Sequence, residues 1–353
     1  MSKAAELAAL IGSQTALSNR NLIINGAMQV AQYGTSSTGN TSGGFKTVDR
    51  FPVQTAGRDQ HIYTAEQVSD APAGFTSSFK LTTTTAESAI DANDAFWFAQ
   101  KIEAQNLQHL QNGLSGAKRV TLSFYVKSSQ TGTFGVNLYK PDNTARIINA
   151  SYTISSANTW EYKTVTFAGD TSGGGIDNDN GEGLRVTWTL AAGSDFDSVN
   201  STSWANYTVT NWAGSHAQDG VITTANATWQ ITGVQLEIGD QATAFEHRPF
   251  GDELARCQRY YYESGGTATN DWGQKGYQSA NNFSANTLQH PVAMRAAPIG
   301  TKVGSFILSN CNAPSIIGTS TIAYQWQMQK NSATGPWSMY SNSSGKFTFN
   351  AEL

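Results

Sequence analysis

Hydrophobic and polar residues alternate along Ala227–Ile238 in a way that predicts a β-strand with one irregular position. Trp229 and Ile231 share one phase, and the apolar positions then move to the opposite phase between Gly233 and Ile238. A glycine at such a change is typical of a β-bulge, which lets a strand bend between two faces of a closed or sandwiched sheet. We therefore expect a bulge at Gly233 in a late core strand.

The clearest alternation elsewhere is at Lys118–Lys127, which reads as a half-buried antiparallel strand. Similar short runs are separated by Gly, Ser, Pro and Asp clusters. They lie at Asn21–Asn25, Phe45–Val53, Gln60–Val68, Phe79–Thr84, Phe96–Glu103, Phe134–Tyr139, Ile147–Ile154, Trp160–Phe167, Leu184–Leu190 and Tyr207–Trp212. About ten strands without an ordinary helix between them predict a jelly-roll β-sandwich over residues 21–250. Leu107–Leu110 is expected to form one helical turn.

A short hinge helix is expected after the sandwich. Acidic residues follow Gly251, and Leu254, Cys257 and Tyr261 recur at helical spacing on one face. We assign residues 251–264 to this helix and a linker, and 265–353 to a smaller antiparallel β domain. Its strands are expected near Tyr277–Phe283, Leu288–Met294, Lys302–Leu308, Thr321–Met328, Trp337–Tyr340 and Lys346–Leu353.

Residues 1–20 predict a short N-terminal helix. Leu7, Leu10, Gln14 and Leu17 have the spacing of a coiled-coil stripe with one polar position. Two heptads do not form a stable helix alone in water. The arm is therefore either frayed, which Gly12 favours, or a helix for docking or oligomerisation.

Composition adds to the β assignment and narrows the class of protein. Charged residues are 14% of the chain, against about 25% in an average globular protein. A net charge of −4 argues against nucleic-acid binding. The two cysteines, Cys257 and Cys311, are interpreted as small core residues rather than a disulfide. No stretch has the length of a signal peptide or membrane span, so we expect synthesis in a cytoplasm without membrane insertion.

The usual catalytic motifs are absent, and the five histidines are scattered without metal-ligand spacing. This predicts a protein that is not an enzyme and needs no cofactor. A catalytic site assembled from distant segments of the chain is an open alternative. His247 lies between Glu246 and Arg248 like a general base, yet its place after the late strand favours a structural role.

Gly173–Gly183 is the best candidate for a cation loop. Asp177, Asp179 and Glu182 offer oxygen ligands at a spacing that partly matches calcium loops, so a structural calcium ion is one hypothesis. The acid expected at the twelfth position of an EF-hand is missing. A hairpin loop rich in glycine and Asn or Asp explains the same residues without metal.

Two groups of aromatic residues are candidates for glycan binding, because the C–H face of a sugar packs on an indole or phenol ring. The first group is Trp204, Tyr207 and Trp212, and the second is Trp272, Tyr277, Trp337 and Tyr340. Each residue alone is also explained as a core or subunit-interface aromatic. The second group has more loop-like surroundings and lies in the last domain, so we expect it to be the receptor-binding tip.

Three motifs together resemble a family of bacteriophage tail-fibre and receptor-binding proteins. They are Asn21–Met28, then Gln235–Gly239 with Ala244–Pro249, and then Glu253–Leu254 with Cys257–Tyr261, and the closing Ala351–Leu353 is similar too. The resemblance implies a carbohydrate-binding-module-like β-sandwich carried on virions, usually as a homotrimer. It implies no fixed ligand residues, and residues 265–345 match no motif of the family.

The sequence therefore favours a virion protein that attaches a phage to a host-surface polysaccharide or lipopolysaccharide, with phage tail or baseplate proteins as further partners. Two alternatives stay open. A purely structural capsid or tail decoration protein would use the sandwich only for packing against neighbours. A polysaccharide depolymerase would use carboxylates brought together between subunits.

Overall fold

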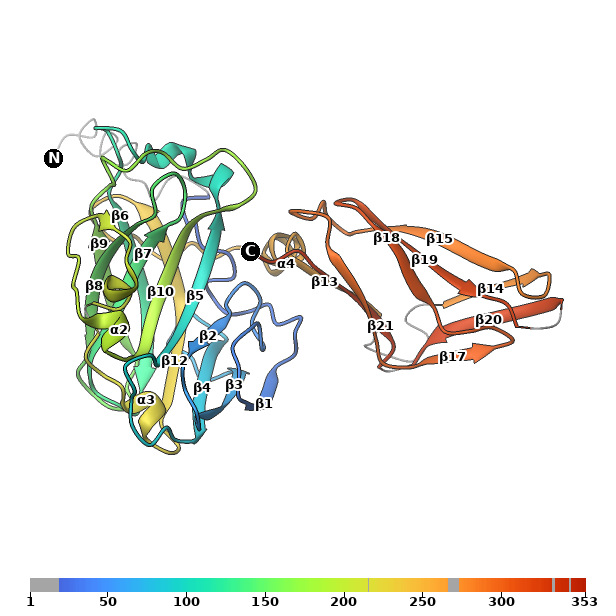
Figure 1. Ribbon diagram of the computed structural model, residues 1–353, viewed down its shortest axis with the longest axis horizontal. Helices are drawn as coiled ribbons and strands as arrows, with labels where there is room; N and C mark the ends of the chain where they lie inside the picture. The colour runs from blue at the N-terminus through green and yellow to red at the C-terminus, as the bar shows by residue number, and fades with distance from the viewer. Residues whose placement is uncertain (1–18, 215, 266–272, 332–333, 343) are drawn as a thin grey trace. The chain divides into compact units, whose positions relative to one another are not determined.

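The computed structural model describes residues 19–214, 216–265, 273–331, 334–342 and 344–353 (Figure 1). The chain divides into two compact units, Met1–Phe250 with the terminal Leu353, and Gly251–Glu352. The helical arm predicted from Leu7, Leu10, Gln14 and Leu17 lies outside the described residues.

The first unit is a jelly-roll sandwich of two antiparallel sheets, as the sequence predicts. The first sheet has the order β1 (Ser36–Asn40), β3 (Ile62–Val68), β4 (Ser78–Thr85), β12 (Thr228–Ile238), β6 (Val120–Ser128) and β9 (Glu161–Phe167). The second has the order β11 (Ala205–Asn206), β8 (Arg146–Ile154), β7 (Gly132–Lys140), β10 (Glu182–Ala192), β5 (Ala95–Glu103) and β2 (Val53–Ala56). The described helices of this unit are short: η2 (Ala104–Leu110), α2 (Ser194–Asp197), η3 (Val209–Asn211) and α3 (Gly220–Thr223).

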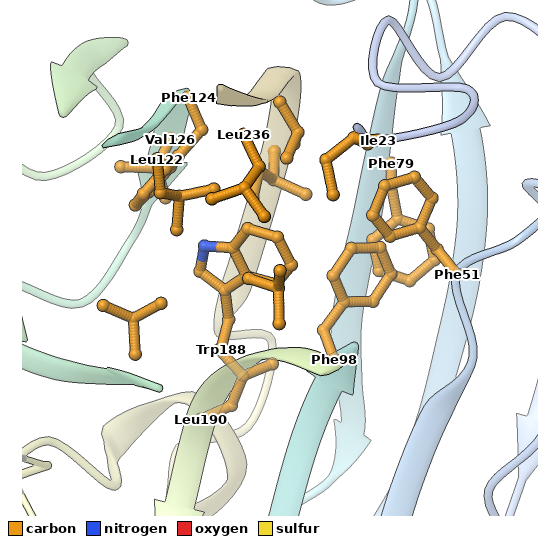
Figure 2. Close-up of a cluster of buried hydrophobic side chains, with 14 of the residues drawn as sticks. Ile23, Phe51, Phe79, Phe98, Leu122, Phe124, Val126, Trp188, Leu190 and Leu236 are labelled. Carbon is orange, nitrogen blue, oxygen red and sulfur yellow. The ribbon is translucent and has the colours of Figure 1, made fainter. Parts of the chain in front are cut away.

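The core lies between the two sheets and is rich in aromatic rings. Figure 2 shows Trp188 of β10 pointing toward side chains of β6 and β12, with Phe98 and Phe51 beside it. The ring centroids of Phe124 and Trp188 are 5.8 Å apart, and those of Phe51 and Phe98 are 5.0 Å apart. Alternation along each strand sends every second side chain into this layer, which leaves the other set for the outer faces.

The predicted bulge in the late core strand is confirmed. Strand β12 lies between β4 and β6, and its pairing with β6 shifts register between Thr232 and Gln235. Gly233 adopts a φ of 62° inside that shift. Trp229 and Leu236, on either side of the bulge, are both fully buried, so the change of phase keeps both halves of the strand directed at the core.

Three strands predicted in the first unit are wrong, and in two of them side-chain hydrogen bonds to the backbone take the place of strand pairing. Asn25 has a φ of 60°, and its Nδ2 donates to the carbonyls of Val30 and Asp49. In the predicted strand Phe45–Val53, regular strand structure starts only at Val53, so most of residues 45–53 is loop. Residues 207–212 contain η3 instead, which begins with a capping box formed by Thr208 and Asn211.

The second unit begins with α4 (Phe250–Gln258), the predicted hinge helix. The helix ends before Tyr261, which starts strand β13 (Tyr261–Gly265), so the predicted face through Leu254, Cys257 and Tyr261 is wrong in its last member. Cys257, Tyr260 and Tyr261 are all buried, but Tyr261 is buried as part of the strand. Residues 251–264, which the sequence assigns to a hinge and linker, thus contribute a paired strand to this unit. Cys257 and Cys311 are buried and form no disulfide, as predicted.

Three three-stranded antiparallel sheets make up the rest of the second unit. Their orders are β13, β21 (Lys346–Asn350), β16 (Ile299–Val303); β14 (Gly273–Gln278), β20 (Gly335–Ser341), β17 (Phe306–Ser309); and β15 (Phe283–Gln289), β19 (Ala323–Gln329), β18 (Ser315–Thr319). Phe347, Phe349 and Ala351 are buried, which confirms the predicted alternation along the last strand. They share a small core with Trp326 and Met339.

Candidate functional site

The outer face of the second sheet carries aromatic and charged side chains. Along β5, Phe96 and Phe98 face the core, so Trp97 points to the other side. By the same alternation Tyr139 of β7 and Arg185 of β10 lie on the outer face, where Arg185 is the direct cross-strand neighbour of both Tyr139 and Lys101. Regular strand pairing therefore sets the spacing of these groups.

The segment between β10 and α3 covers part of this outer face and adds three more rings, those of Phe196, Tyr207 and Trp212. Its backbone is tied to the sheet at several points. Asn137 Nδ2 donates to the carbonyl of Trp212 at 2.7 Å, and the N–H of Tyr207 donates to the carbonyl of Ala145 at 2.8 Å. These bonds fix the rings of the segment over the strands.

Six side chains enclose an open hollow of about 170 Å³, namely Trp97, Tyr139, Arg185, Phe196, Tyr207 and Trp212. The ring of Trp212 lies edge-on to its neighbours, with centroids 5.8 Å from Trp97, 5.7 Å from Tyr139 and 6.0 Å from Tyr207. Trp212 itself is buried, whereas Trp97, Tyr139 and Tyr207 are half-buried. Trp97 Nε1 donates to Gln54 Oε1 at 2.8 Å, which holds the indole in place.

A cation lies among these rings. The Arg185 guanidinium carbon is 5.3 Å from the Tyr139 ring centroid and 5.6 Å from that of Trp212. Its Nε and Nη2 donate to the two oxygens of Glu182 at 2.7 and 2.8 Å, and Lys101 Nζ lies 3.3 Å from the same carboxylate. Burial raises the pKa of both Tyr139 and Tyr207 although Arg185 opposes this, so the phenols stay protonated hydrogen-bond donors at neutral pH.

The structure brings together Tyr207 and Trp212 of the first predicted aromatic group. Trp204 lies apart from them: its Nε1 donates to the carbonyl of Ala168 at 2.6 Å, and its ring packs on the sandwich core. Sequence reasoning missed Trp97, Tyr139, Arg185 and Phe196. Trp97 and Tyr139 were recognisable as the outward members of alternating strands, but only sheet register shows that they meet.

The members of the second predicted aromatic group differ in burial, and the described ones do not all line one hollow. Trp337 and Tyr340 line a hollow of about 480 Å³ with Lys275, Gly276, Ser309, Asn310, Pro336 and Ser338. Trp337 is only 6% exposed and belongs to the core of the second unit, whereas Tyr277 is 75% exposed. Trp272 lies outside the described residues. Because Trp337 is buried in this core, its removal is expected to destabilise the second unit.

The carboxylates of the predicted calcium loop bind other groups of the chain, and Asp177 Oδ1 accepts a hydrogen bond from Asn143 Nδ2 at 3.3 Å. Glu182 is paired with Arg185 and Lys101, and Asp179 Oδ1 accepts the N–H of Gly181 at 2.8 Å. The fully buried Lys140 ammonium donates to the loop carbonyls of Gly173 and Gly174, at 3.0 and 2.8 Å. Within the described ranges, no three His, Cys, Asp or Glu side chains form a group that could hold a metal ion. Asp177, Asp179 and Glu182 thus do not converge on one point.

The two main motifs of the family resemblance interlock, although they are more than 200 residues apart in sequence. Asn21 Oδ1 accepts the N–H groups of Ile23 and Leu236, and its Nδ2 donates to the carbonyl of Val234. Glu246 Oε2 accepts the N–H of Asn21 at 2.9 Å, while Arg248 Nη1 donates to the carbonyl of Ile23 at 2.9 Å. These hydrogen bonds therefore attach the segment at Asn21 to β12 and to the segment that follows β12.

His247 lies among aromatic rings rather than among catalytic groups. Its ring centroid is 4.8 Å from that of Phe245 and 5.3 Å from that of Phe75. This packing agrees with the structural role inferred from sequence.

No protein family model matches the chain, and no curated protein matches it. Solved structures do. One is the enzymatically active domain of tailspike protein 4 of bacteriophage CBA120, with 15% identity and a TM-score of 0.32 over 62% of this chain and 22% of that chain. Another is a family 11 carbohydrate-binding module from Clostridium thermocellum with a bound mixed-linked tetrasaccharide, with 10% identity and a TM-score of 0.30 over 61% of this chain and 99% of that one.

A third is a family 61 carbohydrate-binding module in complex with β-1,4-galactotriose, with 10% identity and a TM-score of 0.29 over 63% of this chain and 100% of that one. In the part of the chain that the structure describes, no helix is long and apolar enough to cross a membrane.

Proposed function

We propose that the chain is a receptor-binding protein of a bacteriophage virion, which attaches the particle to a host-surface glycan without cleaving it. The observation that carries the binding proposal is the hollow formed by Trp97, Tyr139, Tyr207 and Trp212 around Arg185. The virion assignment rests on the family resemblance of the interlocked motifs around Asn21 and Glu246.

The chemistry of the hollow suits a sugar. Half-buried rings offer flat apolar faces for the C–H groups of a pyranose, and Tyr and Arg side chains offer hydrogen-bond donors for its oxygens. Ligand pockets for drug-sized molecules measure about 300–1,000 Å³. A hollow of about 170 Å³ therefore fits one sugar ring, with the rest of the glycan extending over the surface.

A second glycan site in the second unit remains part of the proposal. Tyr340 lines the larger hollow and Tyr277 is exposed, so these two residues are the members of the predicted tip that a ligand can reach without disturbing the core. The two hollows are separable by mutation.

Self-association, as a homotrimer, is also proposed, and the surface of the second unit supports it. Large apolar side chains are exposed on β16, β17, β18 and the loop between β18 and β19, namely Ile299, Val303, Ile307, Leu308, Ile317 and Ile322. Residues 303–329 contain no Asp, Glu, Lys or Arg. Monomeric proteins normally protect edge strands with charges, so an uncharged, apolar edge favours burial against another copy.

Binding of the purified full-length chain to a glycan array tests the function. We expect Trp97→Ala to lower the affinity for the bound glycans about tenfold, because a stacked ring contributes on the order of 1 kcal/mol. Trp160→Ala is the matched control, since Trp160 is half-buried like Trp97 and also donates its Nε1 hydrogen to a side chain, but it directly precedes β9 of the first sheet and does not line the hollow. Tyr340→Ala reports on the second hollow.

If wild type and Trp97→Ala bind the glycan equally while Tyr340→Ala does not bind it, the glycan site lies in the second unit and not in the hollow around Arg185. If no glycan binds, the structural decoration alternative is favoured. Incubation with each bound polysaccharide should leave its chain length unchanged, whereas a reproducible shortening would favour the depolymerase alternative.

A further inference from the structure

The guanidinium of Arg185 has donors to spare. A guanidinium carries five N–H groups in a rigid fork. One edge, Nε and Nη2, is used by the two oxygens of Glu182 at 2.7 and 2.8 Å. Within the described ranges, Nη1 and the second N–H of Nη2 make no hydrogen bond. Because Arg185 lines the hollow, these donors are well placed to meet a ligand there.

Glu182 and the rings fix the position of this donor edge. The carboxylate holds the guanidinium from one side, and Tyr139 and Trp212 lie within 5.3 and 5.6 Å of its central carbon. The guanidinium therefore loses little further conformational freedom when a second anion binds.

The local charge balance favours an anion of one charge. Glu182 shares its negative charge between two cations, Arg185 and Lys101, so the three side chains sum to one positive charge, and Lys101 Nζ also donates to the main-chain oxygen of Leu353 at 3.0 Å. Arg185 and Glu182 are the charged side chains that act on the phenol of Tyr139, and Arg185 is the one that acts on Tyr207. A single carboxylate balances this charge, whereas a phosphate dianion exceeds it.

We propose that the hollow binds a sugar residue that carries a carboxylate, such as a hexuronate, with the ring packed on the aromatic side chains and the carboxylate bound to the free edge of Arg185. The inference rests on the proposed glycan-binding function and names the class of glycan. A neutral sugar would dehydrate the same N–H groups without giving them a charged acceptor, so it would bind more weakly.

The test uses the full-length chain and pairs of oligosaccharides. Glucuronate-, galacturonate-, mannuronate- and sialate-containing oligosaccharides are each compared with the same oligosaccharide after its carboxyl groups are reduced to alcohols. We expect at least one acidic member to bind tenfold or more tightly than its reduced partner, because charge-assisted hydrogen bonds are lost on reduction. Raising the salt concentration should weaken only the acidic member.

Two variants connect that preference to Arg185. Arg185→Gln should abolish the difference between acidic and reduced partners, and Arg185→Lys should retain only part of it because an ammonium lacks the planar fork. Arg119→Gln is the matched control, since Arg119 is also paired with a carboxylate, that of Asp240, but lies outside the hollow. Melting temperatures of all variants verify that the sandwich is folded.

The outcomes separate the two proposals. If oligosaccharides bind through Trp97 but acidic and reduced partners bind equally, or if phosphorylated sugars bind more tightly than carboxylated ones, this inference is overturned and glycan binding stands. If no oligosaccharide of either kind binds, the proposed function of the hollow fails as well.

Discussion

His61 is a buried base whose surroundings keep it neutral. It is 3% exposed, its Nε2 lies 3.0 Å from Thr83 Oγ1, and its Nδ1 lies 2.7 Å from Arg58 Nη1. Burial, together with the positive charge of Arg58, lowers the pKa of His61 to about 3. A neutral imidazole can accept a hydrogen bond at Nδ1 from Arg58, whereas an imidazolium cannot.

This predicts a loss of stability in mild acid. Between pH 6.5 and 3 the unfolded chain binds a proton at His61 that the folded chain does not, so the free energy of unfolding falls as the pH falls. The contribution of this residue is at most about 1.4 kcal/mol per pH unit. Urea unfolding at several pH values should show a shallower pH dependence for His61→Gln than for wild type, and His109→Gln serves as an exposed control. Equal slopes for wild type and His61→Gln would contradict the assignment.

The residues of the hollow show what sequence alone can and cannot supply. Tyr207 and Trp212 were found because they are close in sequence and lie among polar residues. Trp97, Tyr139 and Arg185 come from three strands whose pairing is non-local, so their proximity depends on register. The pairing of Glu182 with Arg185 depends on side-chain geometry that a spacing pattern does not contain.

At the scale of elements, β12 shows why the fold itself was predictable. Its change of phase, the glycine at that point and its apolar content all indicate the same bulged core strand, and the structure agrees. The strand predicted at residues 21–25 is wrong because the local sequence pattern and the long-range contacts disagree there. The run is apolar enough for a strand, but Asn21 and Asn25 bind the backbone of distant segments and hold the chain in a loop.

The bulge leads to a specific prediction for Gly233→Ala. The φ of 62° disfavours any residue with a Cβ atom, and a Cβ would lie 2.7 Å from Phe75 Cζ and 3.1 Å from Tyr125 Cδ2. We expect a destabilisation of about 2 kcal/mol or more, measured by chemical unfolding. Gly251→Ala is the control, because nothing lies within 4 Å of its added methyl group. A wild-type stability for Gly233→Ala would mean that the bulge is not required.

At the scale of the whole molecule, self-association is the property most open to test. Ile307 and Leu308 are consecutive in β17, so they point to opposite faces of the strand, yet they are 48% and 39% exposed. Burial of both side chains requires contacts on both faces of the strand. Two neighbouring copies in a homotrimer can provide one contact on each face.

Analytical ultracentrifugation of the full-length chain should therefore show a trimer at micromolar concentration. Ile307→Lys together with Leu308→Lys should shift it toward monomer, because each substitution places a charge in the apolar contact. Leu114→Lys is the matched control, since Leu114 is 61% exposed in the first unit. Monomeric wild-type protein would count against the trimer, whatever the behaviour of the variants.

Fluorine NMR of protein labelled with 5-fluorotryptophan tests the central claim most directly. The chain has nine tryptophans, and each resonance can be assigned by single substitution. On titration with the glycan that binds most tightly on an array, the resonances of Trp97 and Trp212 should shift, whereas those of the core residues Trp188 and Trp229 should stay in place. Shifts confined to Trp337, or no shift at Trp97 and Trp212 at saturating glycan, would contradict a glycan site in the hollow.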